Sequence, residues 1–247
     1  MADSKITGLG ANTTPLTTDL MLVVDDPAGT AVLQKMTIAS LLTLAVSNVV
    51  VQTITAGSGS YTPTALMKKC LVILQGPGGS GASVTAADDV GGGGGGGGTC
   101  IRLCTAAEVG ASVAYVVGTT GNASTFAVNS MTANTGGAGS ATGNTTTVGV
   151  SAAGGAGGTA TGGDLNITGS AGGRGIMYST TVCKSGEGGS SMLGGGGLAV
   201  SSGGTGAGGN AGGAYGGGGS GAATSDDSNQ TGGTGASGIL YIIEFLD

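Results

Sequence analysis

Eight consecutive glycines, at positions 91–98, constrain this chain more than any other feature of its sequence. Glycine loses more conformational entropy on folding than any other residue, so a long ordered run needs a compensating interaction. One arrangement supplies it. Extended helices with three residues per turn approach closely when side chains are absent, and their backbone N–H and C=O groups then bond between helices. The alternative from sequence alone is a flexible glycine linker.

The rest of the glycine-rich region favours the ordered arrangement. Glycine makes up 58 of 247 residues, while charged residues are only 8% and mean hydropathy is positive, which is unlike a solvated disordered chain. Glycines also recur at positions 203, 206, 209 and 212, with Thr, Ala and Asn between them. That spacing predicts a glycine face on a three-residue helix. Collagen is excluded, because the whole chain has only four prolines.

Composition excludes several classes of function. Thirteen acidic and seven basic residues, with a pI near 4.3, argue against a nucleic-acid-binding protein. The chain has no histidine, so a Ser/His/Asp triad is impossible and the commonest metal ligand is missing. No cofactor is predicted. The N-terminus does not resemble a signal peptide, and the apolar stretch at 41–51 is too short and too polar for membrane insertion.

Cysteines and glycine-rich motifs add no catalytic or metal site. The four cysteines lack C-x-x-C spacing, so a zinc site is disfavoured and free thiols are expected: Cys70, Cys100, Cys104 and Cys183. No G-x-x-x-x-G precedes a Lys-Ser or Lys-Thr pair, as a phosphate-binding loop requires. Asp164, Glu187 and Glu108 leave a glycosidase-like carboxylate pair open, but aromatic platforms for sugars are scarce. We therefore predict that the chain is not an enzyme.

The chain divides by composition near residue 57, which predicts an N-terminal segment at 1–56 and a glycine-rich domain at 57–247. Residues 20–24 and 32–36 are predicted to form a hairpin, followed by a short helix capped by Thr37. Such a small segment cannot bury enough surface alone, so we expect it to oligomerise or dock.

Several apolar runs in the glycine-rich domain are predicted to be strands. We expect the strand at 70–74 to pair with the strand at 239–245 in a small β-sandwich, from which the glycine tracts leave and return. Because these runs are continuously apolar, both of their faces should be covered.

Two parts of the sequence resemble proteins of tailed bacteriophages. The first combines "KIT" at 5–7, "LVVDD" at 22–26 and "KMTIASLL" at 35–42, and is similar to the N-terminal segment of phage fibre and virion proteins. Gln34 replaces a lysine that is common there. The resemblance implies a short trimeric anchor, at residues 1–45, that attaches to another virion protein.

The second part resembles the glycine-rich tips of phage tail fibres. It consists of Tyr61-Thr-Pro63, the strand at 70–74, an internal hairpin at 111–126 and the terminal "GILYIIEF" at 238–245. This resemblance implies a mainly β fold with polyglycine-II helices, a homotrimer, and recognition of a bacterial surface receptor, protein or polysaccharide, through variable loops.

The expected function is that of a structural fibre on the virion that displays adhesive loops. The alternatives are a purely structural head fibre or decoration protein and, more weakly, a glycine-rich cell-surface protein. Loop tips are predicted at 85–89, 119–124, 184–191 and 225–230. A calcium role for their aspartate pairs stays open but is not predicted. The candidate receptor-facing residues are Asp88, Asp89, Asn122, Lys184, Glu187, Asp226, Asp227 and Asn229.

Overall fold

A computed structural model describes residues 20–25, 32–37, 48–143, 148–226 and 228–246. The chain separates into two units, 1–48 and 49–246, with the terminal Asp247 grouped with the first. In the N-terminal unit, β1 (Leu20–Asp25) pairs antiparallel with β2 (Val32–Thr37), which confirms the predicted hairpin. The predicted helix lies outside the described residues. The division falls at residue 48 and not near 57, because β3 (Val49–Ile54) pairs with the last strand of the chain.

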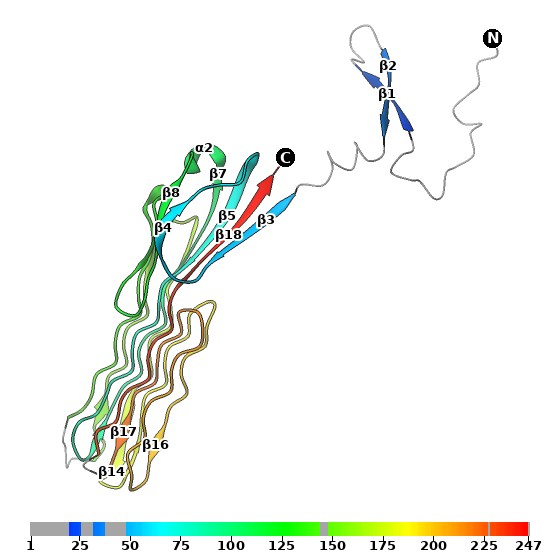
Figure 1. Cartoon of the computed structure of the whole chain (residues 1–247). Helices are drawn as coiled ribbons and strands as arrows, with labels where there is room; N and C mark the ends of the chain where they lie inside the picture. The colour runs from blue at the N-terminus through cyan, green and yellow to red at the C-terminus, as the bar shows by residue number, and fades with distance from the viewer. Residues whose placement is uncertain (1–19, 26–31, 38–47, 144–147, 227, 247) are drawn as a thin grey trace, which may run out of the picture. The chain divides into compact units, whose positions relative to one another are not determined.

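The second unit is mainly β, and its base is a sandwich of two five-stranded antiparallel sheets (Figure 1). We call these sheets I and II. Sheet I has the order β13-β7-β5-β18-β3, with β13 (Leu165–Ile167), β7 (Thr99–Thr105), β5 (Met67–Gln75) and β18 (Ile239–Leu246). Sheet II has the order β12-β10-β9-β8-β4, with β12 (Ala160–Thr161), β10 (Met131–Ala133), β9 (Ser124–Phe126), β8 (Val113–Val117) and β4 (Gly57–Tyr61).

The two sheets share one hydrophobic core. Leu74, Phe126, Met131, Leu240 and Ile242 are all fully buried in it. The helix α2 (Ala106–Val109) and the 3-10 turn η2 (Val128–Ser130) also contribute to this core. The pairing of β5 with β18 confirms the strand pair that anchors both ends of the glycine-rich region.

Extended segments run side by side away from the sandwich, and six of them continue directly from its strands (Figure 1). Within residues 48–246 there are ten of them, and we call them the array. They comprise residues 76–84, 91–98, 134–142, 153–159, 168–174, 185–191, 194–200, 206–213, 216–222 and 230–238.

The eight-glycine run forms the centre of the array, and all its residues are buried. Its N–H groups donate in rotation to three neighbouring segments at 2.8–3.0 Å: 216–222, 134–142 and 168–174. Its carbonyls accept from three others: 185–191, 76–84 and 153–159. The partner therefore repeats every third residue, and the six neighbours are bonded to one another in a closed ring. Segment 216–222 is the centre of a second such ring.

Side chains are excluded from segment 91–98, the centre of the first ring. A Cβ added at Gly93, Gly94 or Gly95 would overlap a backbone carbonyl oxygen of a neighbouring segment. The predicted glycine face at 206, 209 and 212 is also directed at neighbours: Gly209 and Gly212 meet the backbone of segment 216–222. Gly203 was predicted to belong to this face, but an added Cβ there has nothing within 4 Å. It lies in the turn that follows β16.

Turns at the end of the array away from the sandwich carry the remaining strands (Figure 1). These form a two-stranded sheet, β17-β6, and a four-stranded sheet, β11-β14-β15-β16. Their bounds are β6 (Asp89–Val90), β11 (Ser151–Ala152), β14 (Gly175–Ser179), β15 (Val182–Lys184), β16 (Ser201–Ser202) and β17 (Ala223–Thr224). A small second core lies beneath them, formed by Val90, Ala152, Met177, Cys183 and Ala223. We call this region the far end.

Candidate functional site

The acidic turns at the far end are held by their own carboxylates. Asp89 is buried, and its carboxylate accepts hydrogen bonds from the Thr142 hydroxyl (2.9 Å) and the Gly143 N–H (2.8 Å). It therefore joins two turns and does not face solvent. Its neighbour Asp88 is half-buried in a left-handed backbone conformation, with φ 52°.

The turn after β17 has a similar construction. The Asp226 carboxylate accepts from the Thr224 hydroxyl (2.8 Å) and from the N–H (3.0 Å) and hydroxyl of Ser228. Hydrogen bonds from Ser228 and then from Thr224 lower the pKa of Asp226. Asn229 is exposed beside it, whereas Asp227 lies outside the described residues.

Two other predicted loop regions do not lie in the turns of the far end. Asn122 lies in the β8–β9 connection, where Gly118 and Thr120 bond segment 230–238, and so belongs to the sandwich side. The range 184–191 was predicted to be a loop, but this is wrong. Its residues form β15 and an array segment, in which Gly186 and Gly189 bond the eight-glycine run.

Lys184 and Glu187 nevertheless remain exposed, as does Ser190. Their spacing of three puts their side chains on the solvent side of a segment whose intervening glycines face inward. This period is a sequence signal that identifies an outer segment of such an array.

The structure brings Lys184 and Glu187 together in a surface pocket that the sequence did not indicate. The pocket has a volume of about 160 Å³. It lies over the hairpin of β14 and β15, and its lining residues are Gly173, Arg174, Ile176, Tyr178, Lys184, Ser185 and Glu187.

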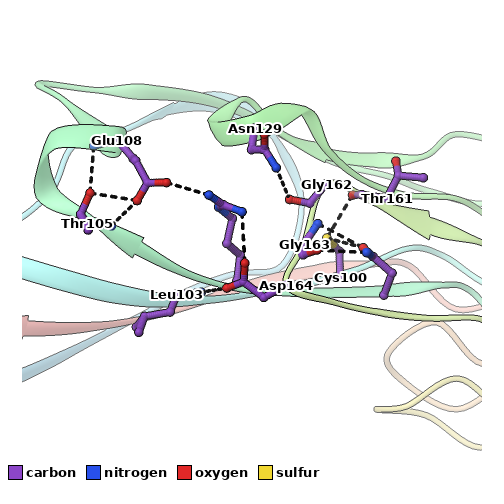
Figure 2. Close-up of polar contacts among 11 residues, drawn as sticks. Cys100, Leu103, Thr105, Glu108, Asn129, Thr161, Gly162, Gly163 and Asp164 are labelled. Carbon is purple, nitrogen blue, oxygen red and sulfur yellow. Dashed lines mark hydrogen bonds and ion pairs between the residues drawn. The ribbon is translucent and has the colours of Figure 1, made fainter.

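A polar cluster near the sandwich, around Arg102, gathers two of the three carboxylates considered for glycoside hydrolysis (Figure 2). The guanidinium of Arg102 bonds Glu108 at 2.7 Å and Asp164 at 3.2 Å. Asp164 also accepts from the Leu103 N–H at 2.9 Å. Glu187 is not part of the cluster, because it lies in the array beside Gly173.

The cluster joins β7 to the start of α2, which is a structural role. Glu108 completes a capping box with Thr105 at the start of α2. The Thr105 N–H and then the Arg102 guanidinium lower the pKa of Glu108 to about 2. A carboxyl with such a pKa is ionised at neutral pH and has no proton to donate, so it is unsuited to general acid catalysis.

A second polar network is buried inside the sandwich. Glu244 is fully buried and accepts from the Tyr61 hydroxyl at 2.6 Å and from the Gln52 amide at 2.9 Å. Burial, followed by the bond to Glu244, raises the pKa of Tyr61. These bonds tie β18, β3 and β4 together, which is a structural role.

The four cysteines are free and buried. Cys70 and Cys104 lie directly opposite each other on β5 and β7, and the bond to Cys104 raises the pKa of the Cys70 thiol. Among the described residues, no group of three or more His, Cys, Asp or Glu side chains could hold a metal ion. No helix in that part of the chain is long and apolar enough to cross a membrane.

Comparisons with known proteins identify no family. A scan against protein-family models finds no match, and a search of curated proteins finds no significant relative.

Proposed function

We propose that this chain is a non-enzymatic virion fibre protein of a tailed bacteriophage, whose array displays turns to a bacterial surface receptor. The observation that carries the proposal is the closed ring of backbone hydrogen bonds around the eight-glycine run. Because the array is held by its backbone, the side chains of the far-end turns are available to vary and to bind. A virion that displays several copies would strengthen a weak contact by multivalency.

We infer further that the array segments are polyglycine-II helices. The three-residue repeat of hydrogen-bond partners supports this, since helices of the polyproline-II type have three residues per turn. Amide hydrogen exchange tests it. The amides of 91–98 should exchange among the slowest in the chain, and exchange as fast as in an unfolded peptide would contradict the inference.

Self-association is proposed through the outer face of sheet I, the face turned away from the sandwich core. Cross-strand register places apolar residues on this face along two rows: Val51, Ile243, Leu71 and Leu103, and then Tyr241, Ile73, Ile101 and Leu165. In the single chain Val49, Val51, Leu103, Leu165 and Phe245 remain 36–53% exposed. Together they expose on the order of 400 Å², the size of patch that often marks an interaction site.

A second copy of the chain suits this face. The continuous apolar runs of β5 and β18 are typical of strands covered on both sides. On this side Leu193, Ala214 and Tyr215 border Ile73 and Tyr241 next to the array, while Val51 and Leu103 remain about half exposed. The two rows contain no charged residue, and the adjacent row of Phe245 contributes Lys69, so copies with a net charge of −6 can meet there without bringing carboxylates into contact. A homotrimer is the assembly we propose.

Sedimentation of the full chain tests this assembly. Val51→Lys should shift it from trimer toward monomer, because it would bury a charge in the interface. Val182→Lys is the matched control, since Val182 is 47% exposed at the far end. A wild-type monomer, or equal behaviour of both variants, would refute the assembly.

The N-terminal unit, residues 1–45, is proposed to attach the fibre to another virion protein, and this rests on the sequence resemblance. Immunogold microscopy of virions with an antibody to the chain tests its location. Absence from the particle would contradict the whole proposal.

Host range tests adhesion. The exchange should move residues 49–246 between phages, because β3 pairs with β18 and a cut near 57 would remove an edge strand. A transferred host range supports adhesion, whereas an unchanged host range assigns the chain a purely structural role, such as a head fibre or decoration protein.

A further inference from the structure

We propose that the pocket over the β14–β15 hairpin binds a sugar residue bearing an anionic group, a carboxylate or a phosphate. This inference deepens the proposed adhesive function and rests on it. The pocket lies at the far end, away from Val49, where the chain enters the second unit (Figure 1).

The hairpin presents its binding side chains on one face. Met177 and Cys183 are cross-strand partners and are fully buried in the far-end core. Strand alternation therefore puts Ile176 and Lys184, which also pair with each other, on the opposite face with Tyr178. Arg174 and Glu187 complete the pocket from the two adjoining array segments.

The two cations in this pocket are available to a ligand. The chain has only seven basic residues, and two of them, Arg174 and Lys184, line this one pocket. Both ion pairs found among the described residues involve Arg102, so neither pocket cation is neutralised by a carboxylate there. Arg174 donates one hydrogen bond, to the Ser151 hydroxyl at 3.3 Å, and its guanidinium has four further N–H donors.

The remaining chemistry of the pocket suits a sugar. Tyr178 is 58% exposed and offers an aromatic surface to the C–H face of a sugar ring. The Glu187 carboxylate can accept hydrogen bonds from hydroxyl groups. A volume of about 160 Å³ is below that of pockets for drug-sized ligands and fits a single sugar ring.

The backbone beneath the pocket is fixed before any ligand binds. The Gly173 N–H donates to the Glu187 carbonyl at 2.7 Å. Ser185 is buried and bonded to Val200 twice, through its N–H at 2.8 Å and through its hydroxyl at 2.9 Å. A preorganised platform of this kind lowers the entropic cost of binding.

Saturation-transfer NMR and calorimetry on the full chain test the site with three probes: D-glucuronate, D-glucose 6-phosphate and D-glucose. One or both anionic sugars should bind, at millimolar affinity, and glucose should bind at least tenfold more weakly. Glucuronate and glucose 6-phosphate distinguish a carboxylate from a phosphate ligand. Added salt should weaken binding, because the cations are exposed.

Four variants at three positions identify the residues. Arg174→Gln and Lys184→Gln should each lower the affinity about tenfold, as expected for loss of a charge-assisted hydrogen bond. Tyr178→Ala should lower it as well, while Tyr178→Phe retains the ring and most of the affinity. Lys68→Gln is the matched control, because it removes the same charge from an exposed lysine on β5, remote from the pocket. Unchanged thermal unfolding of each variant shows that the fold is intact.

Equal binding of all three sugars, no binding of any, or equal effects of Lys184→Gln and Lys68→Gln would each overturn the site. Adsorption of the purified chain to a panel of bacterial cells separates this failure from failure of the proposed function. Cell binding that survives Arg174→Gln and Lys184→Gln would refute the sugar site alone, whereas absence of cell binding would refute adhesion.

Discussion

Six segments of the array continue strands of the sandwich, yet the two regions are stabilised in opposite ways. β5 continues directly into segment 76–84, and segment 91–98 leads directly into β7. In the sandwich each strand has at most two hydrogen-bonded neighbours, and side chains fill the space between sheets. In the array segment 91–98 has six bonded neighbours and no room for a Cβ. Removing the Cβ atoms therefore changes how many neighbours a backbone can bond.

The largest expected loss of stability comes from adding one methyl group at the centre of the array. Gly95→Ala should destabilise the second unit by about 3 kcal/mol or more, because the new Cβ would overlap the Ala156 carbonyl and backbone cannot move aside as a side chain can. Chemical denaturation measures the change. Gly195→Ala is the control, since an added Cβ there has nothing within 4 Å. Equal stability of the two variants would show that close backbone contact is not the reason for glycine.

The junction between the two regions should be the next most sensitive place. Gln75 is fully buried, and its amide donates to the Gly76 and Gly98 carbonyls, both at 2.9 Å, while it accepts from the Thr99 hydroxyl at 2.6 Å. Gln75→Leu should cost about 2 kcal/mol, because it leaves the buried Thr99 hydroxyl without this acceptor.

Gln230→Leu is the comparison for the junction, since Gln230 is half-buried and its side chain bonds only Ser228, at 3.2 Å, at the far end. Denaturation should show a change below about 0.5 kcal/mol for it. A loss as large as that of Gln75→Leu would mean that the junction has no special role.

In the sandwich, removing a methyl group should matter less than adding one in the array. Ile242→Val deletes one methyl group from the fully buried inner face of β18 and should cost about 1 kcal/mol. Ile243→Val on the outer face of the same strand is the control and should cost less in the monomer. If Ile242→Val costs as much as Gly95→Ala, the two regions do not differ in their tolerance to volume.

The sequence predicted those elements for which the residue types along a short segment indicate what the segment contacts. The apolar runs at 70–74 and 239–245 identified the central strand pair, and glycines 206, 209 and 212 identified a glycine face. The strand pair is indicated by continuous apolar runs of strand length, and the glycine face by a period of three residues.

Other features depended on contacts between distant segments. Lys184–Ser191 was predicted to be a loop, but it forms an array segment, which needs glycine only on the sides that face its neighbours. Aspartate is typical of exposed turns, but Asp89 is buried because Thr142 and Gly143, which are distant in sequence, pack against it and donate hydrogen bonds to its carboxylate. The pocket also requires 173–178 and 184–187 to lie side by side, which no local pattern indicates.

The smallest expected effect comes from an ion pair, because neither the sandwich nor the array is held together mainly by interactions between charges. The pKa of Glu108 is lowered to about 2, from an ordinary glutamate value of 4.5. A carboxyl with a depressed folded-state pKa stabilises the fold above its unfolded pKa, and this contribution disappears as the pH falls from about 4.5 to about 2. Glu108→Gln preserves the capping-box pattern but removes the negative charge that pairs with Arg102. The wild type should therefore melt slightly higher than the variant at pH 6 and at the same temperature at pH 2. Glu187→Gln, which removes a carboxylate without a described ion pair, should show no such convergence. A difference between wild type and Glu108→Gln that stays constant from pH 6 to pH 2 would contradict the role of the Arg102 pair.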